Sequence, residues 1–254
     1  MANTFIWYDV MTTDVEAAEK FYCAVIGWKT VDSGMPGTVY KLILNGDTQV
    51  GGIMPVPEDA KGMPPVWMGY IGVDSVDEYA SRVTQAGGKV WKEPRDIPGV
   101  GRFAVVADPH GAGFILFKGN GTAMPAAPFM AKGHVGWNEL HCGDLNEAWD
   151  FYSELFGWHK GFAHDMGPQY GLYQTFGETS EPPGMGGMMK KMDSSPVPHW
   201  TYYFSIGDID AGAKRVKDNG GAVVMEPHEV PGGSWIAPCI DPQGAHFALI
   251  GEKG

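Results

Sequence analysis

The spacing of apolar residues near the start of the chain changes from a period of two to a helical period. Residues 5–11 alternate as expected for a strand, with Phe5, Trp7, Asp9 and Met11 on one face. Thr13 to Glu16 then has the spacing of a helix capping box. Apolar residues follow at positions i, i+3, i+4 and i+7, and Gly27 is a natural helix stop. The pattern predicts a strand and then a helix, whose buried face comprises Ala18, Phe21, Tyr22 and Val25.

The same succession restarts in the middle of this first half. A strand is predicted from Trp67 to Val73, and a second capping-box spacing runs from Ser75 to Glu78. Short strands then follow the Gly87-Gly88 helix stop, and Asp108-Pro109-His110-Gly111 has the composition of a tight turn before the last of them. Each half is therefore predicted to be strand, helix and strands, twice over.

The chain also repeats itself as a whole. Trp7 to Trp28 returns as Trp137 to Trp158, displaced by 130 positions. Later matches are displaced by 133 and include the pairs Trp67/Trp200, Tyr70/Tyr203 and Asp108-Pro109/Asp241-Pro242. The sequence predicts a first domain over 1–118, a Gly/Pro/Ala-rich linker over 119–132 and a second domain over 133–254.

These motifs resemble the glyoxalase/bleomycin-resistance/dioxygenase superfamily, also called vicinal-oxygen-chelate. The resemblance rests on Asp14 to Trp28, its copy Asp144 to Trp158, and the two Asp-Pro-x-Gly turns. It implies an α+β fold of four βαβββ units forming two tandem glyoxalase-like domains with cupped mixed sheets. The family includes metal-dependent isomerases, dioxygenases and metal-free drug-binding proteins, so the fold alone does not give the function.

The resemblance also implies where metal ligands would stand, and those positions hold unsuitable residues. Family ligands are usually His or Glu, on the first strand, near the end of the first unit, on the fifth strand and on the last strand. None of the residues found there binds a divalent metal as His or carboxylate does. We therefore expect no metal and no other cofactor. The matched positions are Trp7 and Trp137, Ile53 and Met188, Met68 and Thr201, and Ile115 and Ala248.

The first strand of each half supplies the candidate site. Strand alternation puts Trp7, Asp9 and Met11 on one face, and Trp137, Glu139 and His141 on the equivalent face. Each set is either a ligand pocket with an aromatic platform or simply core with acids at its rim. Glu139 and His141 are the candidate acid–base pair, with two alternatives: ligands of a metal at a site other than the family's, or a water-exposed strand pair. Further candidate ligand contacts, which would otherwise be core or ordinary strand residues, are Trp67, His199, Trp200 and Met188.

Composition and charge limit the classes of partner and the compartment that we expect. A formal net charge of −12 would repel a phosphate backbone, so no nucleic acid partner is expected. Three widely spaced cysteines form no CxxC pair and suit a reducing compartment. The start lacks the features of a signal peptide, and no apolar run reaches the length of a membrane helix, so we expect a soluble cytoplasmic protein with no membrane partner. Because the duplication can supply an internal partner, a monomer built as a pseudo-dimer of halves, or a homodimer, is expected.

The sequence favours two functions over a third, a purely structural or interaction role, because polar residues are expected to face the pocket. The first is metal-independent binding of a small, partly apolar or aromatic molecule. The alternative is an enzyme, a lyase, isomerase or dioxygenase-like protein acting on a small carbonyl compound such as methylglyoxal through Glu139 and His141. The second half is expected to hold the more functional site, because its face carries a histidine that titrates near neutral pH and the first does not.

Overall fold

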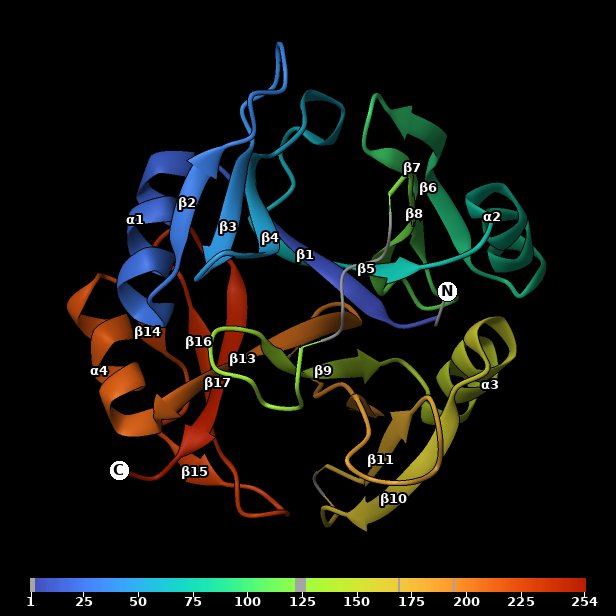
Figure 1. The fold of residues 1–254 in the computed structure, drawn as a ribbon. Coiled ribbons are helices and arrows are strands. Elements are labelled where there is room, and N and C mark those ends of the chain that lie inside the picture. Colours follow the sequence, from blue (N-terminus) through green and yellow to red (C-terminus); the bar gives the residue numbers. More distant parts are fainter. Residues whose placement is uncertain (1–2, 122–126, 169, 194) are drawn as a thin grey trace. The chain divides into compact units, whose positions relative to one another are not determined.

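The computed structural model describes residues 3–121, 127–168, 170–193 and 195–254 (Figure 1). Within them the predicted alternation of helices and strands is confirmed. The helices are α1 (Val15–Ile26), α2 (Val76–Gln85), α3 (Leu145–Phe156) and α4 (Ile209–Asp218), with a short 3-10 helix at Glu58–Ala60.

Each sequence half forms its own mixed sheet. The strands of the first are β1 (Phe5–Thr12), β2 (Lys29–Asp32), β3 (Lys41–Asn45), β4 (Thr48–Pro55), β5 (Val66–Gly72), β6 (Lys89–Ile97), β7 (Gly101–Ala107) and β8 (Gly113–Gly119). Their order is β2-β3-β4-β1-β5-β8-β7-β6. The α+β class and the doubled βαβββ organisation are thus as the sequence predicted.

The second sheet repeats this order with one small addition. Its strands are β9 (Val135–Cys142), β10 (His159–Asp165), β11 (Leu172–Gly177), β12 (Gly186–Lys190), β13 (His199–Asp208), β14 (Ala222–Val223), β15 (His228–Glu229), β16 (Trp235–Ile240) and β17 (His246–Glu252). The order is β10-β11-β12-β9-β13-β17-β16-β14, and β15 pairs with β16. Parallel pairing of β9 with β12, and of β1 with β4, sets the register of the candidate site.

Local capping chemistry fixes where the helices begin and end. The Asp14 side chain accepts a hydrogen bond from the amide of Ala17 at the start of α1, and Ser75 caps α2 in the same way. Gly27 and Gly157 follow α1 and α3 with φ of 93° and 69°, a left-handed conformation that glycine adopts without strain. The predicted capping box at Ser75 and the stop at Gly27 are confirmed, whereas α1 is capped by Asp14 and not by Thr13, the first residue of the predicted box.

The compact units of the structure combine segments from both sequence halves. Unit 1 comprises residues 1–6, 69–126 and 137–200, and unit 2 comprises residues 7–68, 127–136 and 201–254. The sheets follow the repeat, whereas these units do not. Domain boundaries at 118 and 133 stay a prediction, and residues 122–126 of the predicted linker lie outside the described residues.

A buried hydrogen-bonded chain joins the two halves within unit 2. Trp67 donates its indole N–H to the Tyr22 hydroxyl at 2.8 Å, and Tyr22 donates to Oδ2 of Asp241 at 2.9 Å. The other carboxylate oxygen of Asp241 accepts from the amide of Gln243 in the Asp-Pro-x-Gly turn and from that of Ala245, which follows the turn. This turn therefore anchors helix α1, which belongs to the other half of the sequence.

Unit 1 contains an equivalent series of hydrogen bonds, in which the donor–acceptor distances are longer. Trp200 donates to the Tyr152 hydroxyl at 3.1 Å, and the Tyr152 hydroxyl lies 3.4 Å from Oδ2 of Asp108. Asp108 likewise accepts from the amides of its own turn. Burial raises the pKa of Asp108, which is the largest influence on that carboxyl. The two Asp-Pro-x-Gly turns are thus structural anchors as well as turns.

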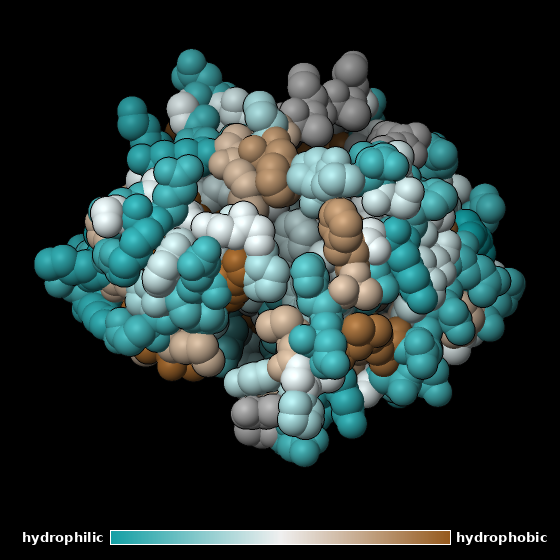
Figure 2. Space-filling view, turned by 90° about the horizontal axis from the view of Figure 1, so that it is seen from below, coloured by the Kyte–Doolittle hydropathy of each residue, from teal (hydrophilic) through white to brown (hydrophobic). Residues whose placement is uncertain are grey.

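Figure 2 shows one face, on which hydrophilic residues predominate and hydrophobic residues form small separate patches. Among the residues that the structure describes, no helix has both the length and the apolar character required to cross a membrane.

Candidate functional site

The second-half site is a hydrogen-bonded cluster on one face of β9 and its neighbours. We define it as Trp137, Glu139, His141, Tyr173 and His199. Trp137 donates its indole N–H to the Tyr173 hydroxyl at 2.7 Å. Tyr173 in turn donates to Oε2 of Glu139 at 2.8 Å. Nε2 of His141 lies 3.0 Å from the other carboxylate oxygen, Oε1.

Two imidazoles face each other beside this carboxylate. The rings of His141 and His199 stack with centroids 4.7 Å apart and an interplanar angle of 15°. Nδ1 of His199 lies 3.0 Å from the carbonyl oxygen of Val197. The His141 side chain is 20% exposed and that of Glu139 is 10% exposed, so the imidazole is the more accessible of the two groups. The structure therefore brings together the acid–base pair and the neighbouring histidine that the sequence singled out.

The first half builds the same framework. We define the first-half site as Trp7, Asp9, Met11 and Tyr40. Trp7 donates to the Tyr40 hydroxyl at 2.9 Å and to Oδ1 of Asp9 at 2.8 Å. Tyr40 donates to the same Asp9 oxygen at 2.8 Å. Both halves thus contain a tryptophan, a tyrosine and a carboxylate in one cluster.

Glycines opposite the acids make room for the two tyrosines. Gly52 pairs with Asp9 and Gly187 pairs with Glu139 across parallel strands, so each pair shares a sheet face. A Cβ on either glycine would lie 2.2 Å from the hydroxyl oxygen of Tyr40 or Tyr173. The second glycine of each Gly-Gly pair is therefore required by the close approach of a tyrosine.

Gly187→Ala is expected to destabilise the protein by about 1–3 kcal/mol, because the new methyl group must displace the Tyr173 ring. Urea unfolding followed by circular dichroism measures the change. Gly207→Ala is the matched control, since nothing lies within 4 Å of a Cβ added there. Equal stability of Gly187→Ala and Gly207→Ala would contradict the packing argument.

The two sites differ in the residues around the shared framework. Met11 stands where the second half has His141. At the positions displaced by 133, Leu42 matches Thr175 and Val66 matches His199. At these three matched positions the first half has apolar residues, whereas the second half has two histidines and a threonine. Only the second offers a nitrogen base beside its carboxylate.

The family's metal positions do not fit a metal in this chain. Trp7 uses its indole N–H as a donor, and indole nitrogen offers no lone pair to a cation. Ile53, Met68 and Ile115 are buried with aliphatic or thioether side chains. Among the described residues, no group of three or more His, Cys, Asp and Glu is arranged to hold a metal ion. The donor set thus argues against the family's usual metal chemistry.

Three predicted ligand contacts lie elsewhere in the fold. Trp67 and Trp200 donate to Tyr22 and Tyr152, and both indoles are almost fully buried. Met188 pairs with Leu140, which points away from the Glu139 face, and both are fully buried. We leave these three residues out of the proposed contact set because they pack in the core.

Sequence reasoning missed Tyr40 and Tyr173. They match each other at a displacement of 133, the same value that relates Trp67 and Trp200. A second signal was the pair of Gly-Gly dipeptides, Gly51-Gly52 and Gly186-Gly187, which indicate close approach of another group. These two observations together would have drawn attention to a bulky residue on the neighbouring strand.

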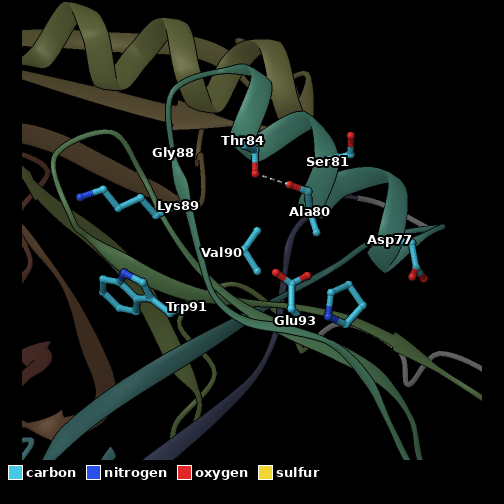
Figure 3. Close-up of a pocket in the computed structure, with 10 residues that line it drawn as sticks. Asp77, Ala80, Ser81, Thr84, Gly88, Lys89, Val90, Trp91 and Glu93 are labelled. Atoms are coloured by element: carbon cyan, nitrogen blue, oxygen red, sulfur yellow. Dashed lines mark hydrogen bonds between the residues drawn. The ribbon is translucent and has the colours of Figure 1, made fainter.

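A separate open groove of about 630 Å³ lies between α2 and β6 in unit 1 (Figure 3). Val90 occupies its centre, while Lys89 and Trp91 lie on the side away from the helix (Figure 3). Of its two acidic residues, Asp77 and Glu93, the first accepts a hydrogen bond from the Arg102 guanidinium at 2.7 Å. No histidine is among the residues that line this groove, so it lacks the His–carboxylate pair of the second-half site and we do not assign it that chemistry.

The buried tyrosines give a pH dependence. The pKa of Tyr173 is raised by burial and then by Glu139, and the pKa of Tyr40 is raised by burial and then by Asp9. Burial, with Asp241, likewise raises the pKa of Tyr22. Unfolded tyrosine ionises near pH 10, whereas these folded phenols stay neutral. Stability is therefore fully present below about pH 10 and falls above it.

Melting temperatures measured between pH 8 and 11 are expected to decline from about pH 10 upward. Tyr173→Phe should reduce the steepness of this decline, since one raised phenol is removed. A melting temperature that stays level up to pH 11 would contradict the assignment.

The comparisons with known proteins agree with the duplicated fold. A family model described as the Glyoxalase/Bleomycin resistance protein/Dioxygenase superfamily matches residues 4–116 and 133–249. "Putative glyoxylase CFP32" of Mycobacterium tuberculosis (strain CDC 1551 / Oshkosh) is 35% identical over 249 residues, covering 96% of this chain and 93% of that protein. "Anthracycline biosynthesis protein DnrV" of Streptomyces peucetius is 30% identical over 257 residues, covering 96% and 91%.

A solved structure of similar fold is the Mn(II)-bound glyoxalase from Novosphingobium aromaticivorans. It has a TM-score of 0.64 and 18% identity, and the match covers 100% of this chain and 83% of that one. At this identity the similarity shows the fold alone.

Proposed function

The chain belongs to the glyoxalase/bleomycin resistance protein/dioxygenase superfamily, and we propose that it binds a small, partly aromatic molecule at the second-half site without a metal ion. The proposal rests on the surroundings of the Glu139 carboxylate. Tyr173 contacts one of its oxygens, His141 contacts the other, and His199 stacks on His141. A partly exposed imidazole beside aromatic rings offers a ligand both a polar partner and a flat apolar surface.

The first-half site supports this choice by contrast. It keeps the tryptophan, tyrosine and carboxylate, yet Met11 replaces the imidazole. The Asp9 carboxylate is 1% exposed and is covered by two donors. A ligand's hydroxyl or carbonyl group therefore finds a suitable partner in the second half and an apolar surface in the first.

The relatives guide the choice of probe. One is named as an anthracycline biosynthesis protein and another as a glyoxylase. An anthracycline such as doxorubicin combines a planar ring system with hydroxyl and quinone oxygens, which suits aromatic and imidazole neighbours. We therefore propose aromatic compounds carrying hydroxyl or carbonyl groups as the ligand class.

His141→Ala is expected to weaken binding of such compounds at least about tenfold, the effect of losing one hydrogen bond in a desolvated site. Ligand-observed NMR of an aromatic fragment set with doxorubicin, followed by calorimetric titration of the hits, measures this. Addition of EDTA should leave the dissociation constants unchanged.

Asp9→Ala and Met11→Ala provide matched controls in the first half. They are expected to leave binding of these hits within about twofold of the full-length parent protein. If Asp9→Ala abolishes binding while His141→Ala leaves it intact, the functional site is the first one. Loss of binding in EDTA would contradict metal independence.

The His–carboxylate pair also favours a second candidate function. A base beside a bound carbonyl compound can move a proton between neighbouring carbons, which is an isomerase or lyase activity. Methylglyoxal with glutathione is the substrate mixture to test, with product absorbance followed in the presence of EDTA. Turnover that is lost in His141→Ala would identify an enzyme, whereas binding without turnover would identify a binding protein.

A further inference from the structure

We propose that Tyr173 is a positioning residue, which holds the Glu139 carboxylate so that His141 presents Nδ1 to the ligand as a proton acceptor. This inference rests on the proposed function of the second-half site. It assigns a task to a residue that lies two strands away from His141 and is not itself an acid or base near neutral pH.

The geometry of the carboxylate carries the first step. Oε2 of Glu139 accepts from the Tyr173 hydroxyl at 2.8 Å, and Oε1 lies 3.0 Å from Nε2 of His141. The two contacts use different oxygens, so they act on one rigid planar group. Fixing Oε2 therefore fixes the direction in which Oε1 faces the imidazole.

The second step concerns what holds Tyr173 itself. Its hydroxyl oxygen accepts from the Trp137 indole at 2.7 Å, so the phenol proton is directed to Glu139. A Cβ on Gly187 would lie 2.2 Å from that oxygen and 2.3 Å from Cζ of the ring. The phenol is thus held by one donor, one acceptor and a close backbone, which leaves it little freedom to turn.

The third step is the tautomer of His141. An ionised carboxylate only accepts hydrogen bonds, so the ring nitrogen that faces it carries a proton. Nε2 faces Glu139, which makes Nδ1 the acceptor nitrogen of the neutral ring. Stacking on His199 at 4.7 Å restrains the plane of the ring. The ordered succession Trp137, Tyr173, Glu139 and His141 therefore sets which nitrogen a ligand meets.

The first half shows what the framework does without an imidazole. Tyr40 makes the equivalent bond to Asp9 at 2.8 Å, and Trp7 donates to Tyr40 at 2.9 Å. Since Met11 stands in place of His141, this framework has no tautomer to fix. Tyr40→Phe is therefore a control that removes the same hydroxyl from the same surroundings in the other half.

The test is nitrogen NMR of the histidine rings in the full-length protein, with no ligand added. In the parent protein, at a pH where the ring is neutral, His141 is expected to show one protonated Nε2 and one unprotonated Nδ1 signal, well separated. In Tyr173→Phe the two signals should move toward each other, because the loosened carboxylate no longer selects one tautomer. Glu139→Gln should have the same effect, since an amide cannot accept from both partners as a carboxylate does.

The outcomes separate this inference from the proposed function. Unchanged His141 signals in Tyr173→Phe overturn the positioning role, and unchanged signals in Glu139→Gln overturn the role of the carboxylate through which it acts. The same shift in Tyr40→Phe also overturns it, because the effect is then not local. If the tautomer changes as expected and no aromatic compound binds the parent protein, the positioning role stands and the proposed function fails. Should Tyr173→Phe not fold, Trp137→Phe removes the donor that directs the Tyr173 proton to Glu139, and unchanged His141 signals in that variant overturn the positioning role.

Discussion

Tyr22→Phe is expected to lower the free energy of unfolding by about 2–4 kcal/mol, although it removes a single oxygen atom. That oxygen accepts from Trp67 and carries the proton donated to Asp241, at 2.8 and 2.9 Å. All three side chains are nearly or fully buried. The substitution therefore leaves an indole N–H and a carboxylate oxygen without their partner in a place that water does not reach.

Tyr152→Phe is the matched variant in the other half and should cost less, about 1–2 kcal/mol. Its contacts to Trp200 and Asp108 are longer, at 3.1 and 3.4 Å, and a bond at the longer distance contributes little. Urea unfolding of both variants gives the comparison. A larger loss of unfolding free energy in Tyr152→Phe than in Tyr22→Phe would show that these distances do not reflect the strength of the hydrogen bonds.

Local sequence patterns predicted most of the fold because its signals are local. The capping residues Asp14 and Ser75 and the stop at Gly27 specify helix ends through contacts within a few positions. Strand β6, Lys89–Ile97, is longer than the short strands predicted after Gly87-Gly88, and it includes Pro94. Proline is tolerated there because β6 lies at the edge of its sheet.

The candidate site was predictable where it depended on alternation along one strand. Glu139 and His141 are two positions apart on β9, so they share a face without any knowledge of the neighbouring strands. Tyr173 comes from β11, and its position beside Glu139 depends on the register of β11 with β12 and of β12 with β9. Register between strands is set by the whole sheet, which explains why both site tyrosines escaped the sequence argument.

The sequence argument did not predict the contacts between the two halves, for the same reason. The bond between Tyr22 and Asp241 spans 219 positions, and no local pattern specifies a contact at that separation. The repeat predicted two similar halves that pack as a pseudo-dimer. It did not predict that each Asp-Pro-x-Gly turn would bind the helix of the opposite half.

Residues 1–118 and 133–254, expressed separately, are each expected to lack a cooperative unfolding transition as monomers. The buried face of α1 contacts Phe247 through Phe21 and Tyr22, with ring centroids 5.9 and 5.5 Å apart. In unit 1, Tyr152 of α3 contacts Phe114 at 5.6 Å. A separated half would expose these aromatic rings together with its unpaired tyrosine and aspartate, a loss of several kcal/mol against a typical total of about 5–15 kcal/mol.

Urea unfolding followed by circular dichroism, with size-exclusion chromatography at the same concentrations, measures the outcome. Because the halves resemble each other, one half has a substitute partner in a second copy of itself. Folding that appears only as a homodimer, or only when the two halves are mixed, would support the interlock, since the missing turn and helix are then supplied in trans. A separated half that elutes as a monomer and unfolds cooperatively at the same urea concentration as the full chain would show that the halves do not depend on each other. Tyr22→Phe in the full chain connects the two experiments, because it weakens the same contact without removing half of the protein.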